Sequence, residues 1–136
     1  MNLAVIGSGG REHAICYKLK QSSKIKKLFC IPGNAGTQKI AKNIKADISN
    51  FDKLYQVIKK NKIELVVVGP EQPLVDGIVD YLNKKKVRVF GPDKFASQLE
   101  GSKAFMKNLC RKHNIPTANF GIFDNCGDAS DFIKKN

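Results

Sequence analysis

The residues of this sequence best suited to chemistry form a glycine-rich segment at positions 7–14, with the sequence GSGGREHA. The segment follows an apolar run at residues 3–6, which predicts a strand, and it opens a stretch with apolar residues at helical spacing. Glycines at such a strand-to-helix turn let backbone N–H groups approach an anion, and the helix N-terminus adds positive potential. The sequence therefore predicts a phosphate-binding loop, with a simple tight turn as the alternative.

This loop departs from the dinucleotide-binding fingerprint in two respects. The fingerprint has Gly or Ala at its sixth position, where this sequence has Glu12. It also has an acidic residue after the second strand, which binds a ribose hydroxyl, whereas the second strand expected here ends in Ile31-Pro32-Gly33. Binding of NAD or FAD is therefore disfavoured.

Two further loops carry polar residues, at positions 32–37 (PGNAGT) and 69–74 (GPEQPL). Each follows a predicted strand, and ligands of open α/β sheets bind beyond the carboxyl ends of the strands, so all three loops should project from one edge. Asn34 is able to donate and accept hydrogen bonds, and Glu71 to accept them from ribose hydroxyls or an amine. Together the loops suit a small phosphorylated sugar, although Asn34 alone is equally well explained as a turn former and Glu71 as an exposed side chain.

Short β-branched runs alternate with amphipathic, lysine-rich stretches, which is typical of a parallel sheet covered by helices. The predicted fold is α/β: an open, mostly parallel, Rossmann-like sheet with helices on both faces. Strands rich in Val and Ile without polar alternation should be central, because both of their faces are covered. Residues 69–71 are predicted as a turn, and Ser49, Asn50 and Asp52 are candidate caps of one helix. Strands are expected at residues 3–6, 25–31, 64–68 and 87–90, and helices at 12–21, 51–62 and 75–85.

The rhythm changes after Pro92, and we place a domain boundary near Gly101. Residues 1–100 form one expected domain, and residues 101–136 begin a second one. In this part we expect a short helix at 93–100, a helix at 102–114 capped by Ser102, a strand at 118–123 and a helix at 127–135.

The charge of the chain first suggests a nucleic-acid binder, since 24 Lys and Arg residues against 12 Asp and Glu residues give a net charge of +12. However, 21 of these cations are Lys, and many fall in the last turns of predicted helices. There each complements the helix dipole by about 0.3–1 kcal/mol at low salt. A nucleic-acid surface would use more Arg and stacking aromatic residues, so solvated helix ends are the favoured interpretation.

Cysteine spacing and hydropathy exclude further classes of protein. The four cysteines form no CxxC pair, which disfavours a structural zinc site, and the longest apolar run, residues 65–68, is too short to span a bilayer. A location in the reducing cytoplasm is expected, with no membrane partner.

Four motifs, including residues 69–77 (GPEQPLVDG) and 101–107 (GSKAFMK), occur in the order and spacing of the glycinamide ribonucleotide synthetase family. The sequence resembles this family, the phosphoribosylamine–glycine ligases of the ATP-grasp superfamily, over its whole length. The resemblance implies a pre-ATP-grasp domain followed by the start of an ATP-grasp region. It also implies a step of purine biosynthesis, in which ATP with Mg²⁺ or Mn²⁺ activates glycine as glycyl phosphate, which the amine of 5-phosphoribosylamine attacks.

The resemblance also implies roles for individual residues. Gly9, Gly10 and Arg11 would hold the 5-phosphate, and Lys103 would approach the phosphates of ATP. His13 and His113 are expected to be structural or surface residues. The full set of expected substrate-binding residues is Gly9, Gly10, Arg11, Glu12, Asn34, Gly36, Glu71 and Asp76.

Members of the family are longer than this chain, and the resemblance implies that most of the nucleotide clamp and the acidic metal ligands lie outside it. Phosphoryl transfer depends on such groups, so we expect no catalytic residue, no metal ligand and no ligase activity in these 136 residues alone. The resemblance implies a monomer for the full-length form and no nucleic-acid partner. The alternative is a stand-alone basic α/β module that binds nucleotides or nucleic acid.

Overall fold

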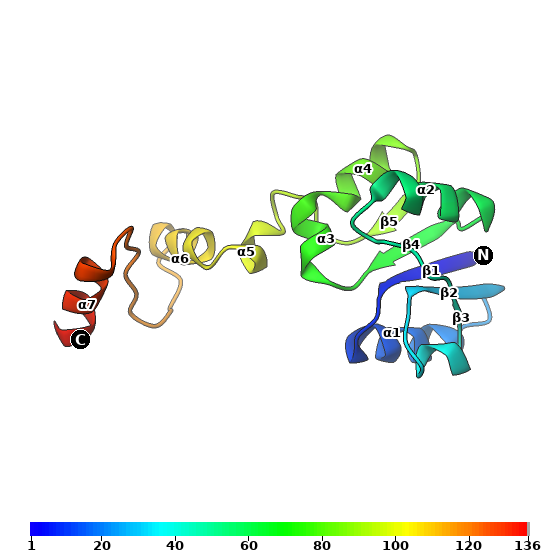
Figure 1. Ribbon diagram of the computed structural model, residues 1–136, viewed down its shortest axis with the longest axis horizontal. Coiled ribbons are helices and arrows are strands. Elements are labelled where there is room, and N and C mark those ends of the chain that lie inside the picture. Colours follow the sequence, from blue (N-terminus) through cyan, green and yellow to red (C-terminus); the bar gives the residue numbers. More distant parts are fainter. Residues whose placement is uncertain (136) are drawn as a thin grey trace. The chain divides into compact units, whose positions relative to one another are not determined.

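The computed structural model describes residues 1–135 of the chain. These residues fall into two compact units, the first spanning Met1–Ser97 and the second starting at Gln98. The first unit holds the sheet and the three loops, and the second is helical (Figure 1).

The first unit contains a five-stranded sheet in which every paired strand is parallel, in the order β3-β2-β1-β4-β5. This confirms the predicted fold class. β1 is central, and its Val5 pairs with Cys30 on one side and Val67 on the other. The strands are β1 (Asn2–Gly7), β2 (Lys27–Pro32), β3 (Lys42–Asn43), β4 (Leu65–Val68) and β5 (Arg88–Phe90).

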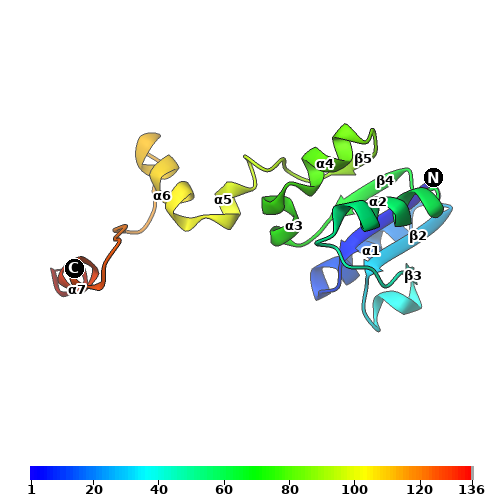
Figure 2. The same ribbon diagram turned by 45° about the horizontal axis from the view of Figure 1, so that its top comes forward.

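Helices cover both faces of this sheet, α1 on one and α2 with α4 on the other (Figures 1 and 2). Alternate residues of β1 point to the two sides: Leu3 and Val5 pack with α1, whereas Ala4 and Ile6 pack with α2 and α4. This explains the missing polar alternation in β1. The elements are α1 (Gly10–Lys20), the 3₁₀ turn η1 (Thr37–Lys39), α2 (Phe51–Lys60), α3 (Glu71–Asp76) and α4 (Ile78–Lys84).

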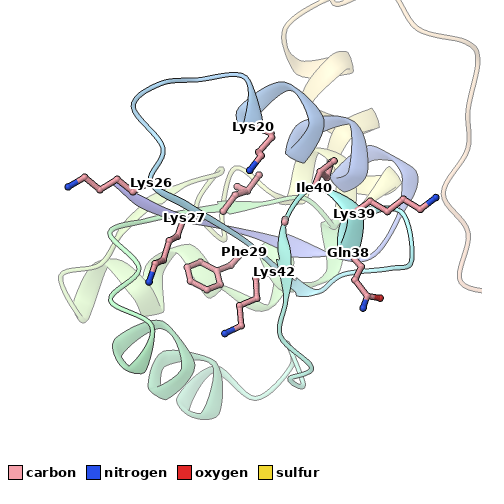
Figure 3. Close-up of a pocket in the computed structure, with 10 residues that line it drawn as sticks. Lys20, Lys26, Lys27, Phe29, Gln38, Lys39, Ile40 and Lys42 are labelled. Carbon is pink, nitrogen blue, oxygen red and sulfur yellow. The ribbon is translucent and has the colours of Figure 1, made fainter.

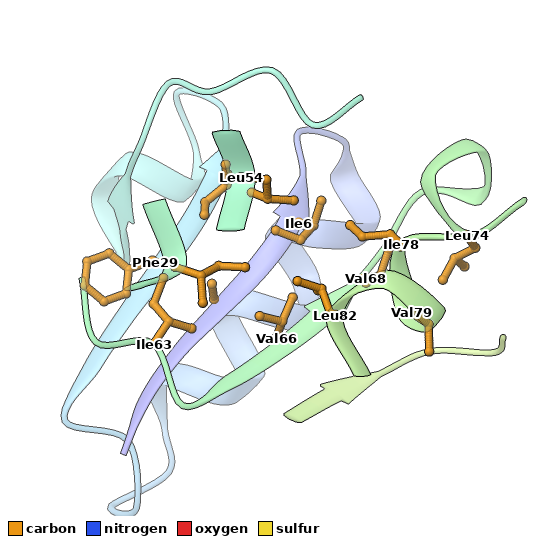
Figure 4. Packing of buried hydrophobic residues seen from close by; sticks show 13 residues of the cluster. Ile6, Phe29, Leu54, Ile63, Val66, Val68, Leu74, Ile78, Val79 and Leu82 are labelled. Atoms are coloured by element: carbon orange, nitrogen blue, oxygen red, sulfur yellow. The ribbon is translucent and has the colours of Figure 1, made fainter. Parts of the chain in front are cut away.

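The larger core lies beneath α2 and α4 (Figure 4). Leu54 of α2 and Ile78 and Leu82 of α4 are fully buried against Ile6 and Val66 of the central strands. Because this core fixes β1 and β4 next to each other, it also fixes where the loops that follow them begin.

The segment after β4 differs from the prediction. The sequence predicts a turn at residues 69–71 and one helix at 75–85, but α3 already begins at Glu71 and ends at Asp76, and α4 starts at Ile78, after Gly77. Pro73 fits the first turn of α3, because N–H groups there have no partner within the helix. Gly77 has φ +96°, a left-handed conformation that favours glycine and interrupts the helix.

The second unit contains α5 (Gln98–Gly101), α6 (Lys103–Lys112) and α7 (Cys126–Lys135). The predicted cap is confirmed, because Ser102 Oγ accepts a hydrogen bond from Phe105 N at 3.2 Å. The expected helix at 93–100 is formed only from Gln98 onward.

The predicted strand at 118–123 is wrong, because this segment has no regular secondary structure. A strand needs a neighbour to share its backbone hydrogen bonds, and no strand is found among the described residues from Gln98 onward. Side chains of α6 contact the segment instead: Lys107 Nζ donates to Ala118 O at 3.1 Å, and the Arg111 guanidinium lies 4.4 Å from the centre of the Phe120 ring.

The lysine distribution follows the helices as expected. Basic side chains occupy the last turns of α1, α2, α4, α6 and α7, where they complement the helix dipoles. No helix among residues 1–135 combines the length and the apolar composition that a bilayer crossing requires.

Of the three candidate caps of α2, the structure selects Asn50, whose Oδ1 accepts a hydrogen bond from Lys53 N at 3.0 Å. Loss of an N-cap side chain costs about 1 kcal/mol, so Asn50→Ala should lower the free energy of unfolding by about that amount in urea titrations. The matched control is Ser49→Ala, since Ser49 Oγ only bonds the exposed Asp47 carboxylate, and its expected loss is below about 0.5 kcal/mol. Equal losses in both variants would contradict the assignment.

Candidate functional site

The three predicted loops meet at the carboxyl edge of the sheet, because β2, β1 and β4 are adjacent and parallel. Backbone hydrogen bonds connect them: Gly33 N donates to Gly7 O, and Gly69 N donates to Ile6 O, both at 3.1 Å. The expectation that the loops share one edge is confirmed. We call residues 7–12, 32–37 and 69–71 the loop edge.

Glu12 lies at the centre of the loop edge and is only 4% exposed. Its Oε2 accepts a hydrogen bond from Gly9 N at 2.6 Å, and its Oε1 accepts one from Arg11 Nε at 3.3 Å. Gly7, Gly9 and Gly69 surround the side chain, and a Cβ atom at any of the three would come closer than 3.0 Å to it. The glycines of the first and third loops therefore make room for this carboxylate.

Arg11 links the first loop to the helix that follows the third. Its Nη2 donates to Glu71 Oε1 at 3.1 Å, while its Nε faces Glu12. These hydrogen bonds, to Glu71 first and then to Glu12, raise the pKa of Arg11 above its ordinary value. The side chain is half-exposed, so its cation is within reach of a ligand at the edge.

Gly10 is the first residue of α1, and a Cβ atom built on it would have no atom within 4 Å. The N–H groups of Gly10 and Arg11 lie in the first turn, where a helix offers no internal partner, and they contribute to the positive end of the helix dipole. Gly9 N donates to the Glu12 side chain, so the N–H groups of Gly10, Arg11 and Glu12 are the donors of this first turn that remain for an anion.

Asn34 connects the second loop to the first. Its Nδ2 donates to Ser8 O at 2.7 Å and to Gly9 O at 3.3 Å, and its Oδ1 accepts from Thr37 N at 2.9 Å. Both polar ends of the side chain thus hold the loops in place. Gly36 allows close packing beside it, since a Cβ there would lie 2.7 Å from the His13 imidazole.

Two residues of this network were missed in the sequence. Thr37 is fully buried and its Oγ1 accepts from Asn34 N at 2.8 Å, while Asn43 Nδ2 donates to Asn34 O at 2.7 Å. Asn43 lies in β3, a strand of two residues that is too short to show a period, so its role has no sequence signal. Thr37 belongs to the motif at residues 32–37, but the sequence of the motif does not show that this residue is buried and hydrogen-bonded.

A cavity of about 590 Å³ adjoins the second loop. It borders η1, and Lys45 supplies a cation at its wall. Its lining residues are Pro32, Gly33, Asn34, Ala35, Gln38, Asn43 and Lys45.

Two predicted site residues take no part in the hydrogen bonds described above. Asp76 is exposed at the C-terminal end of α3, where it accepts a hydrogen bond from Gln72 Nε2 at 2.8 Å. Lys103 is the exposed first residue of α6 in the second unit.

A basic cavity lies against β2, β3 and the end of α1 (Figure 3). It measures about 290 Å³ and is bordered by five lysines: Lys20, Lys26, Lys27, Lys39 and Lys42. Its one aromatic residue, Phe29, is only 3% exposed and cannot stack on a base. The cavity therefore offers charge without the aromatic platform of a single-strand binding groove.

Metal-binding side chains do not gather in the part of the chain that the structure describes. No three His, Cys, Asp or Glu residues among positions 1–135 lie close enough to hold an ion. The four cysteines are free thiols, of which Cys16, Cys30 and Cys110 are buried and Cys126 is exposed.

Known proteins similar to this chain share both its sequence and its fold. A phosphoribosylamine–glycine ligase from Rhodopirellula baltica is 50% identical over 133 residues, covering 98% of this chain and 30% of that protein. One from Clostridium acetobutylicum is 43% identical over 135 residues, covering 99% of this chain and 32% of that protein. The chain thus spans less than a third of the length of these relatives.

Among solved structures, a phosphoribosylamine–glycine ligase from Thermotoga maritima matches 99% of this chain and 30% of its own, with a TM-score of 0.73 and 29% identity. An N5-carboxyaminoimidazole ribonucleotide synthetase from Thermus thermophilus matches 98% of this chain and 36% of its own at 17% identity and a TM-score of 0.68, which shows a shared fold alone. The model of the phosphoribosylglycinamide synthetase N domain matches residues 1–100. The resemblance found in the motifs is confirmed, and the chain belongs to the phosphoribosylglycinamide synthetase family.

Proposed function

We propose that this chain binds the sugar phosphate substrate of a phosphoribosylamine–glycine ligase. The observation that carries the proposal is the open N-terminus of α1 at the loop edge, where Gly10 and Arg11 offer free backbone donors beside the Arg11 cation. A phosphate is the ligand that such a helix end favours. The names of the similar proteins supply the sugar, 5-phosphoribosylamine.

In this proposal Arg11 contacts the phosphate of the substrate, and Glu71 contacts its ribose hydroxyls or its amine. A phosphate entering at Gly10 competes for the Arg11 guanidinium, which Glu71 holds through one hydrogen bond. The Glu71 carboxylate, whose Oε1 accepts from Arg11, is also able to accept a hydrogen bond from a ribose hydroxyl or from the amine. Asn34, Gly36 and Glu12 shape the loops around this position, and Asp76 stays a proposal from the family resemblance alone.

The proposed reaction of the whole enzyme joins glycine to this amine. The glycine carboxylate takes the terminal phosphoryl group of ATP, the amine displaces that phosphate, and glycinamide ribonucleotide, ADP and phosphate result. We assign no step to Mg²⁺ or Mn²⁺, since the described residues hold no cluster of ligands for it.

We further propose that residues 1–100 are the substrate-binding domain and that residues 101–136 begin the ATP-grasp region, with Lys103 directed to ATP. The two compact units and the span of the family model support this division. A cytoplasmic monomer that acts on small molecules is part of the proposal. The stand-alone nucleic-acid module is not favoured, because the chain belongs to a family of ligases.

The phosphate site is tested by Gly10→Glu, with Gly10→Gln as a neutral control of the same size. Both side chains fit the open space at this position, and both remove a glycine from a helix, so both variants should fold. Ribose 5-phosphate titrated calorimetrically into the chain should bind saturably. Gly10→Glu should bind at least about tenfold more weakly than Gly10→Gln, because a carboxylate repels the phosphate. Equal affinities in the two variants, or no binding to the folded chain, would sink the proposal.

Turnover is tested separately. With glycine, ATP, Mg²⁺ and freshly generated 5-phosphoribosylamine, the 136-residue chain should release no ADP above background. The reason is that Lys103 is the single residue of this chain that we assign to ATP, and phosphoryl transfer needs more groups than one lysine. The release of ADP is followed by a coupled spectrophotometric assay, with ATP and buffer alone as the blank. Glycine-dependent ADP release by this chain would contradict the proposal that these residues hold the substrate-binding domain and only the start of the ATP-grasp region.

A further inference from the structure

We propose that Glu12 is a positioning residue that takes the place of the third glycine of a dinucleotide-binding loop and thereby limits the loop to a single phosphate group. The inference rests on the proposed function for the identity of that phosphate. Within residues 7–12, Glu12 is the position that departs from the dinucleotide fingerprint, which has Gly or Ala there.

The first step of the argument is the burial of the carboxylate. A charged group is costly to bury unless it is paired, and Glu12, at 4% exposure, has two partners. The bond from Gly9 N, at 2.6 Å, has the short length of a charge-assisted hydrogen bond, and the Arg11 guanidinium supplies the opposite charge. The carboxylate is therefore fixed in position rather than displayed to a ligand.

The second step concerns space. In the dinucleotide fingerprint the second glycine lets the backbone approach a pyrophosphate, and the small sixth residue lets the helix pack closely on the strand. Here the Glu12 side chain fills the gap between Gly7, Gly9 and Gly69, each of which would clash with it if it carried a Cβ atom. The first two glycines of the pattern are thus retained, but they accommodate a carboxylate of the protein.

The third step concerns donors and charge. Because Glu12 occupies Gly9 N, the N–H groups of Gly10, Arg11 and Glu12 remain at the helix end, which suffices for one phosphate. A second phosphate on the side of Gly9 would meet a fixed negative charge. The loop should therefore select sugar monophosphates over diphosphates.

The test uses Glu12→Gln and Glu12→Ala in the 136-residue chain, with ribose 5-phosphate and ADP-ribose as probes. Glu12→Gln keeps the size of the side chain and removes its charge, whereas Glu12→Ala restores the residue type of the fingerprint. The native chain should bind ribose 5-phosphate at least about tenfold more tightly than ADP-ribose. The ratio should fall at least about fivefold in Glu12→Gln and further in Glu12→Ala, through tighter binding of ADP-ribose.

A second readout reports on positioning without any ligand. In ¹H–¹⁵N spectra the Gly9 amide should resonate far downfield in the native chain, because it donates to a carboxylate at 2.6 Å, and should move upfield in Glu12→Gln. If Glu12→Ala does not fold, Glu12→Gln decides the test through both readouts. An unchanged ratio with an unmoved Gly9 amide would overturn the inference.

The two proposals fail separately. If the native chain binds neither probe, the proposed function fails, but a gain of ADP-ribose binding in Glu12→Ala or Glu12→Gln still supports the role of Glu12. If the native chain binds ribose 5-phosphate and neither variant gains affinity for ADP-ribose, the role of Glu12 fails and the proposed function stands.

Discussion

The hydrogen bond from Gly9 N to the buried Glu12 carboxylate is the interaction around which the loop edge is built. The carboxylate determines why three positions are glycine, and through Arg11 it connects the first loop to Glu71 of α3. A buried charge must keep its partners, so the loops that supply or border those partners are held in one arrangement. The loop edge is therefore held together by contacts within the chain.

The buried sheet determines where the three loops of this edge begin. Since β1 is covered on both faces, its direction and register are fixed, and the glycine loop leaves it beside the ends of β2 and β4. The Asn34 side chain then fastens the second loop to the carbonyl groups of Ser8 and Gly9. The core thus sets the position of the edge, and a few polar side chains set its shape.

Much of the fold was predictable because its signals are local. The β-branched strands, the glycine loop, the cap at Ser102 and the lysines at helix ends all follow from short-range preferences. Prediction failed where contacts with residues distant in the sequence determine the secondary structure of a segment. The segment at 118–123 has strand-like residues, yet contacts with Lys107 and Arg111 hold it without a partner strand. The short β3 owes its strand character to its pairing with β2.

For the site, the sequence by itself determined the residue types, the family and the edge of the sheet at which the loops gather, because parallel strands place their carboxyl ends together. Only the tertiary structure decided which of those residues face each other. Glu12 looked like a departure from a fingerprint, and Asn34 like a ligand or a turn former. Asn34 bonds carbonyl groups of the first loop, and Gly69 of the third loop closes over Glu12, whose own partners are Gly9 and Arg11. Burial, which no single position encodes, requires each polar atom to find a partner.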